Sequence, residues 1–352
     1  MLICVQDYEL AAKAKLDKVI YDFAFGGAQD EITLHENRKA YQRILFRPRV
    51  LRGAFDGDLS VLLCQTKASL PLIMAPTAFH KLYCEQGELA TAMAASHENV
   101  VMIISMASTV SLDDLHARMQ HHQGQFWFQF YVQPEISFNQ YLVDMATKAG
   151  CQALVITVDS PQFGQRERDI KNQFHDLPAG LRCENLVIDG VIKSIEFNNH
   201  LNWNDIKRIQ KMTKLPIILK GILHPADALM ALEHGISGII VSNHGGRQLD
   251  GTAATIDLVT DIASVVQKKI PIIVDGGIRR GSDIVKALAL GADAVAIGRP
   301  ILWGLAVEGE EGVRHIIRIL KKELLHTLAL CGCQSLQTLS PDYLYHNQRM
   351  DK

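Results

Sequence analysis

The sequence lacks a strong net charge and any long apolar run. Its 352 residues contain 36 Lys and Arg against 38 Asp and Glu, so the formal net charge at pH 7 is only −2. Nucleic-acid-binding domains concentrate basic residues, and this balance therefore favours a small-molecule ligand over a nucleic acid. No stretch approaches the roughly 18 apolar residues of a membrane span. The first residues lack the basic region of a secretion signal, and the last residues lack a peroxisomal Ser-Lys-Leu address, so we predict a soluble, cytoplasmic protein without membrane insertion.

The sequence also lacks a cysteine pattern that would indicate disulfides or a metal. Its seven cysteines are odd in number and scattered, mostly in apolar runs, as expected for reduced thiols in a cytosolic core. Cys331 and Cys333 are too close together and too isolated for a zinc site. A dinucleotide-binding fingerprint in its strand-turn-helix context is missing as well. We predict neither a metal nor a Rossmann domain.

What the sequence does contain is eight short apolar runs, separated by segments with apolar residues at helical spacing. Strands that are apolar on both faces and alternate with helices form parallel sheets, and eight of them close into a (β/α)8 barrel. We predict an α/β fold of this TIM-barrel type over 71–340, with an N-terminal helical extension at 1–70 that caps the barrel and a C-terminal tail at 341–352. The predicted strands lie within 71–78, 100–105, 126–132, 153–159, 216–222, 238–245, 271–277 and 294–300.

Polar residues stand at the end of every predicted strand. Catalytic groups of such barrels gather at the carboxyl ends of the strands, and buried polar groups cost free energy unless a partner satisfies them. These strand ends therefore predict a polar ligand. The polar residues are, in chain order, Thr77, Ser105, Gln129 with Tyr131, Thr157 with Asp159, Lys220, Ser242 with His244, Asp275 and Arg299.

The most informative segment is 242–248, Ser-Asn-His-Gly-Gly-Arg-Gln, which follows an apolar run. His244 belongs to the residue type that gains and loses a proton near neutral pH, and the rigid guanidinium fork of Arg247 matches a carboxylate. The pair predicts a base beside an anion clamp. The alternative is a loop histidine and a surface arginine that lie close together by chance.

A second segment favours a phosphate. Loops after the seventh and eighth strands of such barrels often bind phosphate, because glycine amides approach its oxygens and an arginine adds charge. The sequence offers Gly276, Gly277 and Arg279 after the seventh strand and Gly298 with Arg299 after the eighth. A tight turn without a ligand is the alternative reading of the Gly-Gly pair.

Together these motifs give the chain a resemblance to the FMN-dependent 2-hydroxy acid oxidase and dehydrogenase family. The resemblance runs from Asp22 to the region of Cys333, with 242–248 and 275–281 as its most specific segments. Residues 75–78, 157–161 and Lys220-Gly221 occur in the order that the family shows. The segments 79–80 and 216–223 are more similar to the long-chain hydroxy acid oxidase branch than to glycolate oxidase.

The resemblance implies a catalytic role for four residues. His244 would take a proton from the substrate as two electrons pass to the flavin, and Asp159 would stabilise the imidazolium. Tyr131 would bond the substrate hydroxyl or the nascent carbonyl, and Lys220 would stabilise the reduced flavin. Taken alone, each has a structural alternative: a strand-end cap for Asp159, a snorkelling side chain for Lys220 and a core aromatic for Tyr131.

The resemblance also implies how substrate and cofactor are bound. Arg247 would hold the substrate carboxylate in a bidentate pair, with Arg166 as a second cation. The FMN would contact Ser105, Gln129, Thr157, Lys220 and Ser242 at its edge, Ala75, Pro76, Thr77 and Ala78 along its face, Asp275 and Gly276, and, at its phosphate, Gly277, Arg279, Gly298 and Arg299.

Two departures from the family bear on the substrate. Phe23 stands where short-chain oxidases carry a tyrosine that bonds the carboxylate, and Ala107 stands where glycolate oxidase carries a tryptophan. The first removes a hydrogen-bond donor and the second widens the pocket, so we predict a medium-chain, long-chain or aromatic (S)-2-hydroxy acid. Alternatively, Met106 or a mobile loop residue fills the gap at Ala107.

The electron acceptor is the least determined part of the prediction. Residues 174–201 contain no apolar membrane insert, which favours an oxidase that reduces oxygen to hydrogen peroxide. The alternative is a lactate-type dehydrogenase that passes electrons to a quinone or carrier. Less favoured are a non-redox FMN enzyme of the isopentenyl diphosphate isomerase type, a flavin-binding protein without turnover and a peptide-modifying enzyme. A homotetramer is expected because relatives commonly form one.

Overall fold

The protein folds around a closed eight-stranded parallel barrel, seen in a computed structural model that describes residues 1–53, 55, 57–122 and 124–346. Each of the eight predicted runs overlaps one barrel strand, so the TIM-barrel prediction is confirmed. In the order around the barrel the strands are β4 (Leu72–Met74), β5 (Val101–Ser105), β6 (Gln125–Phe130), β7 (Ala153–Thr157), β10 (Ile217–Ile222), β11 (Gly238–Val241), β12 (Ile272–Asp275) and β13 (Ala294–Ile297).

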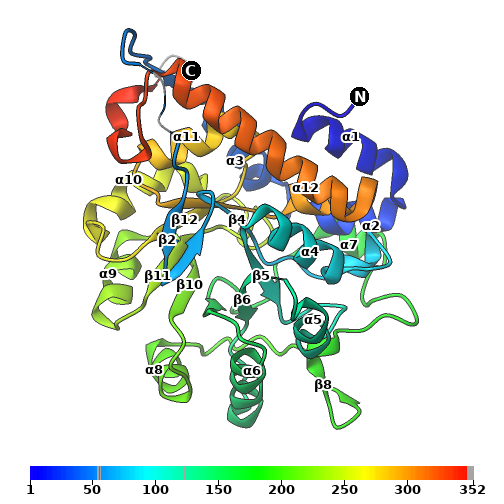
Figure 1. Cartoon of the computed structure of the whole chain (residues 1–352). Helices are drawn as coiled ribbons and strands as arrows, with labels where there is room; N and C mark the ends of the chain where they lie inside the picture. Colours follow the sequence, from blue (N-terminus) through cyan, green and yellow to red (C-terminus); the bar gives the residue numbers. More distant parts are fainter. Residues whose placement is uncertain (54, 56, 123, 347–352) are drawn as a thin grey trace.

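A helix follows each barrel strand and covers the outside of the barrel (Figure 1). Local sequence signals set several of their ends. Asn202 and Asp205 form a capping box at the start of the fourth of these helices, and Pro225 occupies the first turn of the fifth, where its missing N–H costs nothing. The helices are α4 (Glu88–Glu98), α5 (Leu112–Met119), α6 (Ile136–Lys148), α8 (Trp203–Met212), α9 (Pro225–Glu233), α10 (Thr255–Val266), α11 (Gly281–Ala289) and α12 (Arg299–Leu330), the last with a kink at 308–309.

The amino-terminal end of the barrel is closed by a hairpin from the N-terminal extension. Strands β2 (Val61–Leu63) and β3 (Thr66–Ala68) pair antiparallel, and Leu63 joins the buried cluster that fills the barrel interior. The indole Nε1 of Trp127, on β6, donates a 2.9 Å hydrogen bond to the hydroxyl of Thr66. The predicted helical extension did not include this hairpin, because its two strands have only three residues each.

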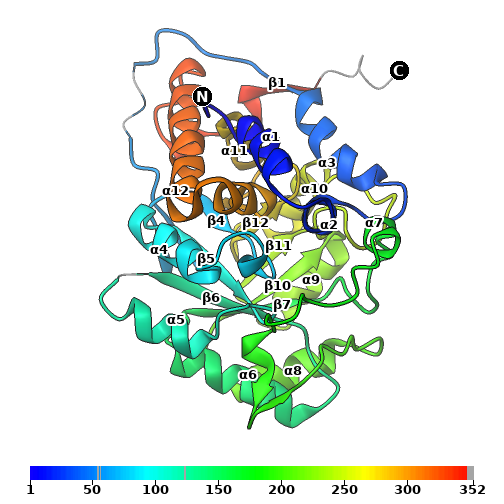
Figure 2. The same ribbon diagram turned by 90° about the vertical axis from the view of Figure 1, so that its right-hand side faces the viewer.

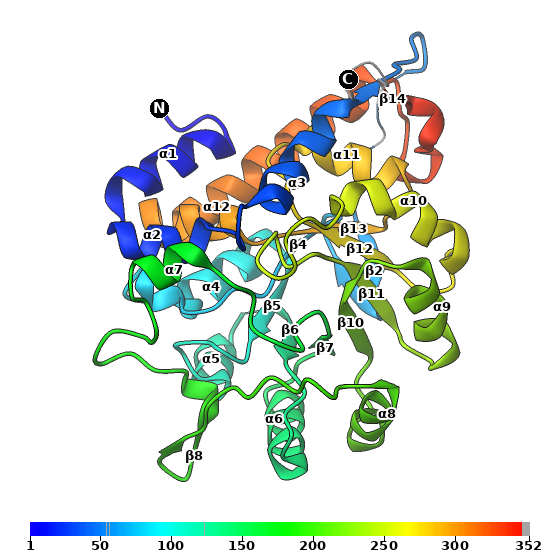
Figure 3. The ribbon, with the colours of Figure 1, turned by 180° about the vertical axis from the view of Figure 1, so that it is seen from behind.

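Three helices of the extension lie at the opposite, carboxyl end. Helices α1 (Val5–Lys15) and α2 (Lys18–Phe25) pack against α12, and α3 (Ile32–Arg43) packs against α10 (Figures 1 and 3). The amide of Ala28, just after α2, donates a 2.8 Å hydrogen bond to the carbonyl of Gly246. The extension is thus joined to the loop that carries His244.

The N-terminal extension also pairs with the C-terminal end of the described chain. Strand β1 (Ile44–Phe46) pairs antiparallel with β14 (Leu344–His346), whereas the rest of the predicted tail, 347–352, lies outside the described residues. The long connection after β7 contains α7 (Glu167–Lys171) and the hairpin of β8 (Val187–Ile188) and β9 (Val191–Ile192), which projects below the barrel in Figure 2. Within the described part of the chain, no helix is long and apolar enough to cross a membrane. The division into domains stays a prediction.

Gly277 fixes how closely α3 approaches the barrel. Its φ is +80°, and a Cβ there would lie 1.8 Å from the carbonyl oxygen of Asn37 on α3. We expect Gly277→Ala to lower the free energy of unfolding by about 2 kcal/mol or more, because backbone strain and a steric clash add. Urea denaturation followed by circular dichroism measures the change.

Gly235→Ala is the matched control for Gly277→Ala. Gly235 also has a positive φ, +67°, but an added Cβ would meet nothing within 4 Å. Only the left-handed conformation then opposes alanine, which costs about 1 kcal/mol. Equal losses in the two variants would show that the contact with Asn37 does not constrain α3.

Candidate functional site

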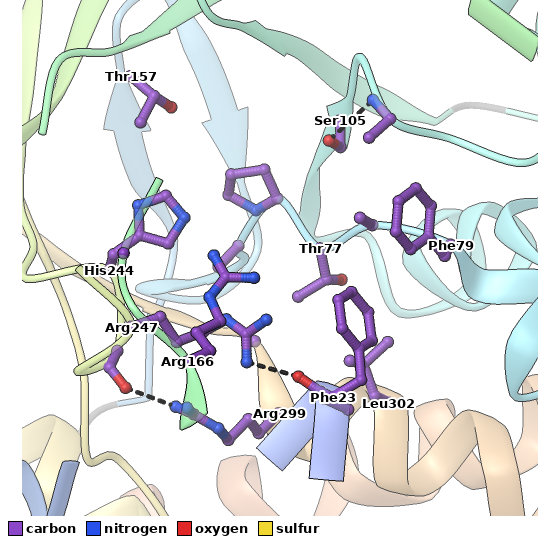
Figure 4. A pocket seen from close by; sticks show the side chains of 18 of the residues that line it. Phe23, Thr77, Phe79, Ser105, Thr157, Arg166, His244, Arg247, Arg299 and Leu302 are labelled. Atoms are coloured by element: carbon purple, nitrogen blue, oxygen red, sulfur yellow. Dashed lines mark hydrogen bonds between the residues drawn. The ribbon is translucent and has the colours of Figure 1, made fainter. Parts of the chain in front are cut away.

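A cavity of about 740 Å³ opens at the carboxyl end of the barrel. Its wall contains every predicted site residue except Asp159 and Ser242, which lie behind the wall and hydrogen-bond to residues that line it. Figure 4 shows that His244, Arg247, Arg166, Arg299 and Phe23 converge on this space from different segments. The structure therefore brings the predicted residues together in one place.

His244 and Asp159 form a buried pair at the centre of the wall. The imidazole Nδ1 lies 2.9 Å from an Asp159 carboxylate oxygen, which leaves Nε2 as the ring nitrogen that can accept a proton. Burial lowers the pKa of His244 below its ordinary value, against the opposing effect of Asp159. Burial raises the pKa of Asp159, but the charges of His244 and Lys220 and hydrogen bonds from His244 and Ser160 lower it overall. A neutral imidazole beside a carboxylate anion is the arrangement of a general base.

Two local features position this pair. His244 has a φ of +57°, a conformation that is uncommon outside glycine and frequent at functional sites, and its amide donates to the hydroxyl of Ser242. Gly221, at φ +111°, lets β10 approach Asp159, since a Cβ there would lie 2.6 Å from the Cβ of Asp159. Gly221 of the Lys220-Gly221 motif is therefore also required for the close packing of β10 against Asp159.

Polar side chains on neighbouring strands form a row that consists of two hydrogen-bonded groups. The hydroxyl of Ser105 donates to the Gln129 amide oxygen at 3.1 Å, and the Gln129 amide nitrogen donates to the Thr157 hydroxyl at 3.0 Å. On the next strands, the Lys220 ammonium donates to the Ser242 hydroxyl at 2.9 Å and lies 3.5 Å from Asp275. This row offers donors and acceptors to the edge of a planar polar ring.

Arg247 and Arg166 form a cationic end of the cavity. One terminal nitrogen of Arg247 donates to the backbone carbonyls of Phe23 and Gly26 at 2.6 and 3.2 Å. The Arg166 guanidinium lies 4.0 Å from the Phe163 ring centroid, and burial, followed by the charge of Arg247, lowers its pKa to about 9. Two desolvated cations of this kind attract a carboxylate.

Arg279 and Arg299 form a second cationic region beside Gly298. Burial lowers the pKa of Arg279 to about 10, and the Arg279 guanidinium lies over the Trp303 ring at 4.6 Å. Arg299 donates to the carbonyls of Gly245 and Gly26 at 2.9 and 2.8 Å, so it also ties the His244 loop to the end of α2.

Several atoms here still have hydrogen bonds to make. The Nε atoms of Arg279 and Arg299 and one carboxylate oxygen of Asp275 are buried and have no partner among the described residues. Buried orphan donors of this type indicate a ligand. The site fits FMN: the row from Ser105 to Lys220 matches a polar ring edge, and the two arginines match a phosphate.

Sequence reasoning missed an aromatic wall that lines the same cavity. Phe79 stacks on Phe23 with ring centroids 5.6 Å apart, and Phe174 packs on Phe23 at 4.6 Å. These rings come from irregular segments after β4 and β7, where no periodic pattern marks a residue as buried. The missed lining residues include Phe79, Tyr83, Phe163, Asp169, Ile170, Phe174, Leu177, Ile195 and Phe197.

No cluster of three or more His, Cys, Asp or Glu side chains that could hold a metal occurs in the part of the chain that the structure describes. The described cysteines are free thiols.

The fold and the site define a class, the (β/α)8-barrel enzymes with a phosphate-binding carboxyl end. Residues 12–346 match the family of FMN-dependent dehydrogenases. The chain is 44% identical to an L-lactate oxidase of Nostoc sp. over 96% of this chain and 97% of that protein. It is 42% identical to a 2-hydroxyacid oxidase 2 of Rattus norvegicus over 97% and 98% of the two chains.

Solved structures agree with this match. A mandelate oxidase with (S)-2-phenylpropionate superposes with a TM-score of 0.89 at 38% identity, over 98% of both chains. A mutant of an active chimera of (S)-mandelate dehydrogenase has a TM-score of 0.93 at 35% identity, over 99% of this chain and 100% of that one. The chain belongs to the FMN-dependent dehydrogenase family, and it is an FMN-dependent oxidoreductase.

We expect Arg279→Met to raise the Kd of FMN about 10-fold or more, because a hydrogen bond to a charged group contributes about 1.5–3 kcal/mol. Methionine retains an apolar contact with Trp303 while removing the charge. Quenching of FMN fluorescence on binding to the apoprotein measures the Kd. Arg280→Met is the control, since Arg280 pairs with Glu323 at the surface and does not line the cavity; similar effects of both variants would remove Arg279 from the phosphate site.

Proposed function

We propose that the protein oxidises an (S)-2-hydroxy acid with a medium-chain, long-chain or aromatic side chain to the 2-oxo acid, and passes the electrons to oxygen. The observation that carries this proposal is one cavity that combines three parts: the His244–Asp159 base, the cation pair of Arg247 and Arg166, and a wall of aromatic and aliphatic side chains. A 2-hydroxy acid needs the first two parts, and an apolar substituent needs the third.

Different residues of the cavity would bind the substrate and accept its proton. Bound FMN supplies the two-electron acceptor. Arg247 and Arg166 would hold the substrate carboxylate, and this anchor would place the 2-carbon near His244. His244 Nε2 would take a proton from the substrate, and Asp159 would stabilise the imidazolium on the Nδ1 side. The acid loses two electrons and two protons in total, and oxygen gains both to give hydrogen peroxide.

Tyr131 and Lys220 would assist the same step. Burial raises the pKa of Tyr131 well above its ordinary value, so its hydroxyl remains a donor for the substrate hydroxyl or the new carbonyl. Lys220 is buried within the polar row, and there its charge would favour an anionic reduced ring.

The apolar wall supports a large substituent. Ala107 lines the cavity, whereas Met106 is fully buried with its sulfur 3.2 Å from the amide of Tyr131 and is not part of the wall. The position of Met106 therefore does not support the alternative in which this side chain fills the space beside Ala107. Among the similar solved structures is a mandelate oxidase mutant with (S)-mandelic acid, an aromatic 2-hydroxy acid.

Oxygen as acceptor is supported by the names of the similar proteins, which include lactate, glycolate and 2-hydroxyacid oxidases. A dehydrogenase that passes electrons to a quinone or carrier is the second candidate, and the superposition on (S)-mandelate dehydrogenase favours it. A non-redox enzyme would not need the His244 and Arg247 pair. The homotetramer and the cytoplasmic location stay predictions; two of the similar plant oxidases are named peroxisomal.

Anaerobic bleaching of the flavin tests the proposal. We expect the larger members of a series from glycolate to 2-hydroxyoctanoate and mandelate to bleach the FMN absorbance rapidly, and air to restore it quickly. Slow recovery would establish a dehydrogenase, and bleaching by none of the acids would refute the proposed function. His244→Ala is the control that should retain FMN but lose bleaching.

The pH dependence of flavin reduction tests the His244–Asp159 pair. Burial lowers the pKa of His244 below 6.5, so the base is neutral at pH 7 and the reduction rate should fall only as the pH drops below 6.5. Asp159 raises the pKa of His244, and Asp159→Asn should therefore move this fall to lower pH. The same variant should reduce the plateau rate about 100-fold or more, because the imidazolium loses its counter-charge.

Stopped-flow absorbance across pH 4.5–8.5, a range of about two units on either side of the ordinary histidine pKa, measures both effects. A lower plateau with an unchanged acid limb would mean that a group other than His244 titrates.

A further inference from the structure

Tyr83 is a buried tyrosine whose hydroxyl lacks a hydrogen-bond partner. It follows the short 3-10 helix η1 (His80–Leu82) after β4, is only 7% exposed and lines the cavity. The hydroxyl oxygen is closed to water and makes no hydrogen bond to any described residue. A buried hydroxyl without a partner destabilises a protein, and a phenylalanine would fill the same space without that cost. The described residues supply no partner for the hydroxyl, so an acceptor bound in the cavity would satisfy it.

Tyr83 and the Arg247 guanidinium influence each other electrostatically. Burial raises the pKa of Tyr83 well above its ordinary value, while the charge of Arg247 acts in the opposite direction. The influence is mutual, because Tyr83 also acts on the pKa of Arg247, together with Asp169 and Tyr131. Tyr83 therefore keeps its proton at neutral pH, and it lies within electrostatic reach of the guanidinium at the cationic end.

The side chain that lies over this guanidinium has no donor to offer. The Phe23 ring centroid is 5.3 Å from the Arg247 Cζ, and a phenylalanine ring cannot donate a hydrogen bond. One terminal nitrogen of Arg247 is already bonded to the backbone carbonyls of Phe23 and Gly26. A carboxylate held by Arg247 would thus have oxygen lone pairs that remain free to accept a hydrogen bond, and Phe23 cannot donate one.

The two aromatic residues belong to one packed group. Phe79 stacks on Phe23 and lies four residues before Tyr83. Because the segment after β4 packs on α2 in this way, a hydroxyl on that segment can donate a hydrogen bond to a ligand in the space beside Phe23. The Tyr83 hydroxyl, which lacks a hydrogen-bond partner, and Phe23, which has no hydroxyl to donate, therefore lie at the same end of one cavity.

We propose that Tyr83 donates its hydroxyl to the substrate carboxylate held by Arg247, and so supplies from the segment after β4 the hydrogen bond that Phe23 cannot make. The identity of the ligand as a 2-hydroxy acid rests on the proposed function, whereas the binding of a carboxylate beside Tyr83 does not. The carboxylate is the acceptor that the Tyr83 hydroxyl otherwise lacks. In return, the hydroxyl adds a directional hydrogen bond to the electrostatic attraction of Arg247.

Binding of two ligands that the enzyme cannot oxidise tests this proposal. Hexanoate and hexanamide have the same chain, but only hexanoate is an anion. Their Kd values for the FMN-loaded protein are read from the shift of the flavin visible absorbance. We expect Tyr83→Phe to weaken hexanoate about 10-fold or more, as for the loss of a hydrogen bond to a charged group, and to change the Kd of hexanamide by less than about 2-fold, since its neutral acceptor makes the weaker bond.

Two further variants make the result specific. Phe23→Tyr in the Tyr83→Phe background restores a hydroxyl at this end of the cavity and should recover most of the affinity for hexanoate. Tyr141→Phe removes a hydroxyl that contacts the Val187 carbonyl outside the cavity, and it should leave both Kd values unchanged. FMN content and the thermal midpoint confirm that each variant is folded.

Three results would overturn the proposal: equal hexanoate affinity with and without the Tyr83 hydroxyl, equal losses for hexanoate and hexanamide, or no binding of hexanoate to the wild-type protein. These results differ from failure of the proposed function. If no 2-hydroxy acid bleaches the flavin, the function is wrong, but the dependence of hexanoate binding on Tyr83 is still measured without turnover.

Discussion

Burial of positive charge at the carboxyl end of the barrel is the constraint on which the rest of the site depends. Burial is the largest influence on the pKa of all four guanidinium groups there and lowers each of them, and for Arg299 the charges of the other three act in the same direction. Part of this cost is offset by backbone carbonyls, since Arg247 and Arg299 both donate to the carbonyl of Gly26. Anionic groups on a cofactor and a substrate would offset the remainder. The same hydrogen bonds hold the end of α2 against the loop that carries His244.

Burial and the neighbouring charges together determine the state of the base. Burial lowers the pKa of His244, Asp159 raises it, and the cations Lys220 and Arg166 lower it further. The net result is a neutral imidazole with a fixed carboxylate behind it, so the ring is ready to accept a proton without first losing one. The cavity then has a cationic end, the His244–Asp159 pair and an aromatic wall, and this division supports the proposed substrate, a 2-hydroxy acid with an apolar substituent.

Much of this arrangement could be predicted from the sequence, because the information is local. Each barrel strand is buried on both faces and reads as an apolar run, and the polar residue at its carboxyl end follows within a few positions, as Asp159 follows β7 and His244 follows β11. Closure of the barrel then brings all these ends to one rim. The (β/α)8 fold and the position of the cavity follow from that geometry, whereas the pairing of His244 with Asp159 was implied by the family resemblance.

Other features were decided only by tertiary structure. The hydrogen bond that Trp127 donates to Thr66 of the β2–β3 hairpin, the pairing of β1 with β14 and the carbonyl contacts of Arg247 with α2 join segments far apart in the chain. Tyr83 and the phenylalanines of the wall lie in irregular segments, where side-chain direction depends on packing and not on a period of 2 or 3.6 residues. The sequence by itself determined the barrel and the chemical groups on its rim, since both follow from short-range patterns. Which aromatic rings enclose those groups, and which hydroxyl reaches the cationic end, depended on contacts that form only when the whole chain is folded.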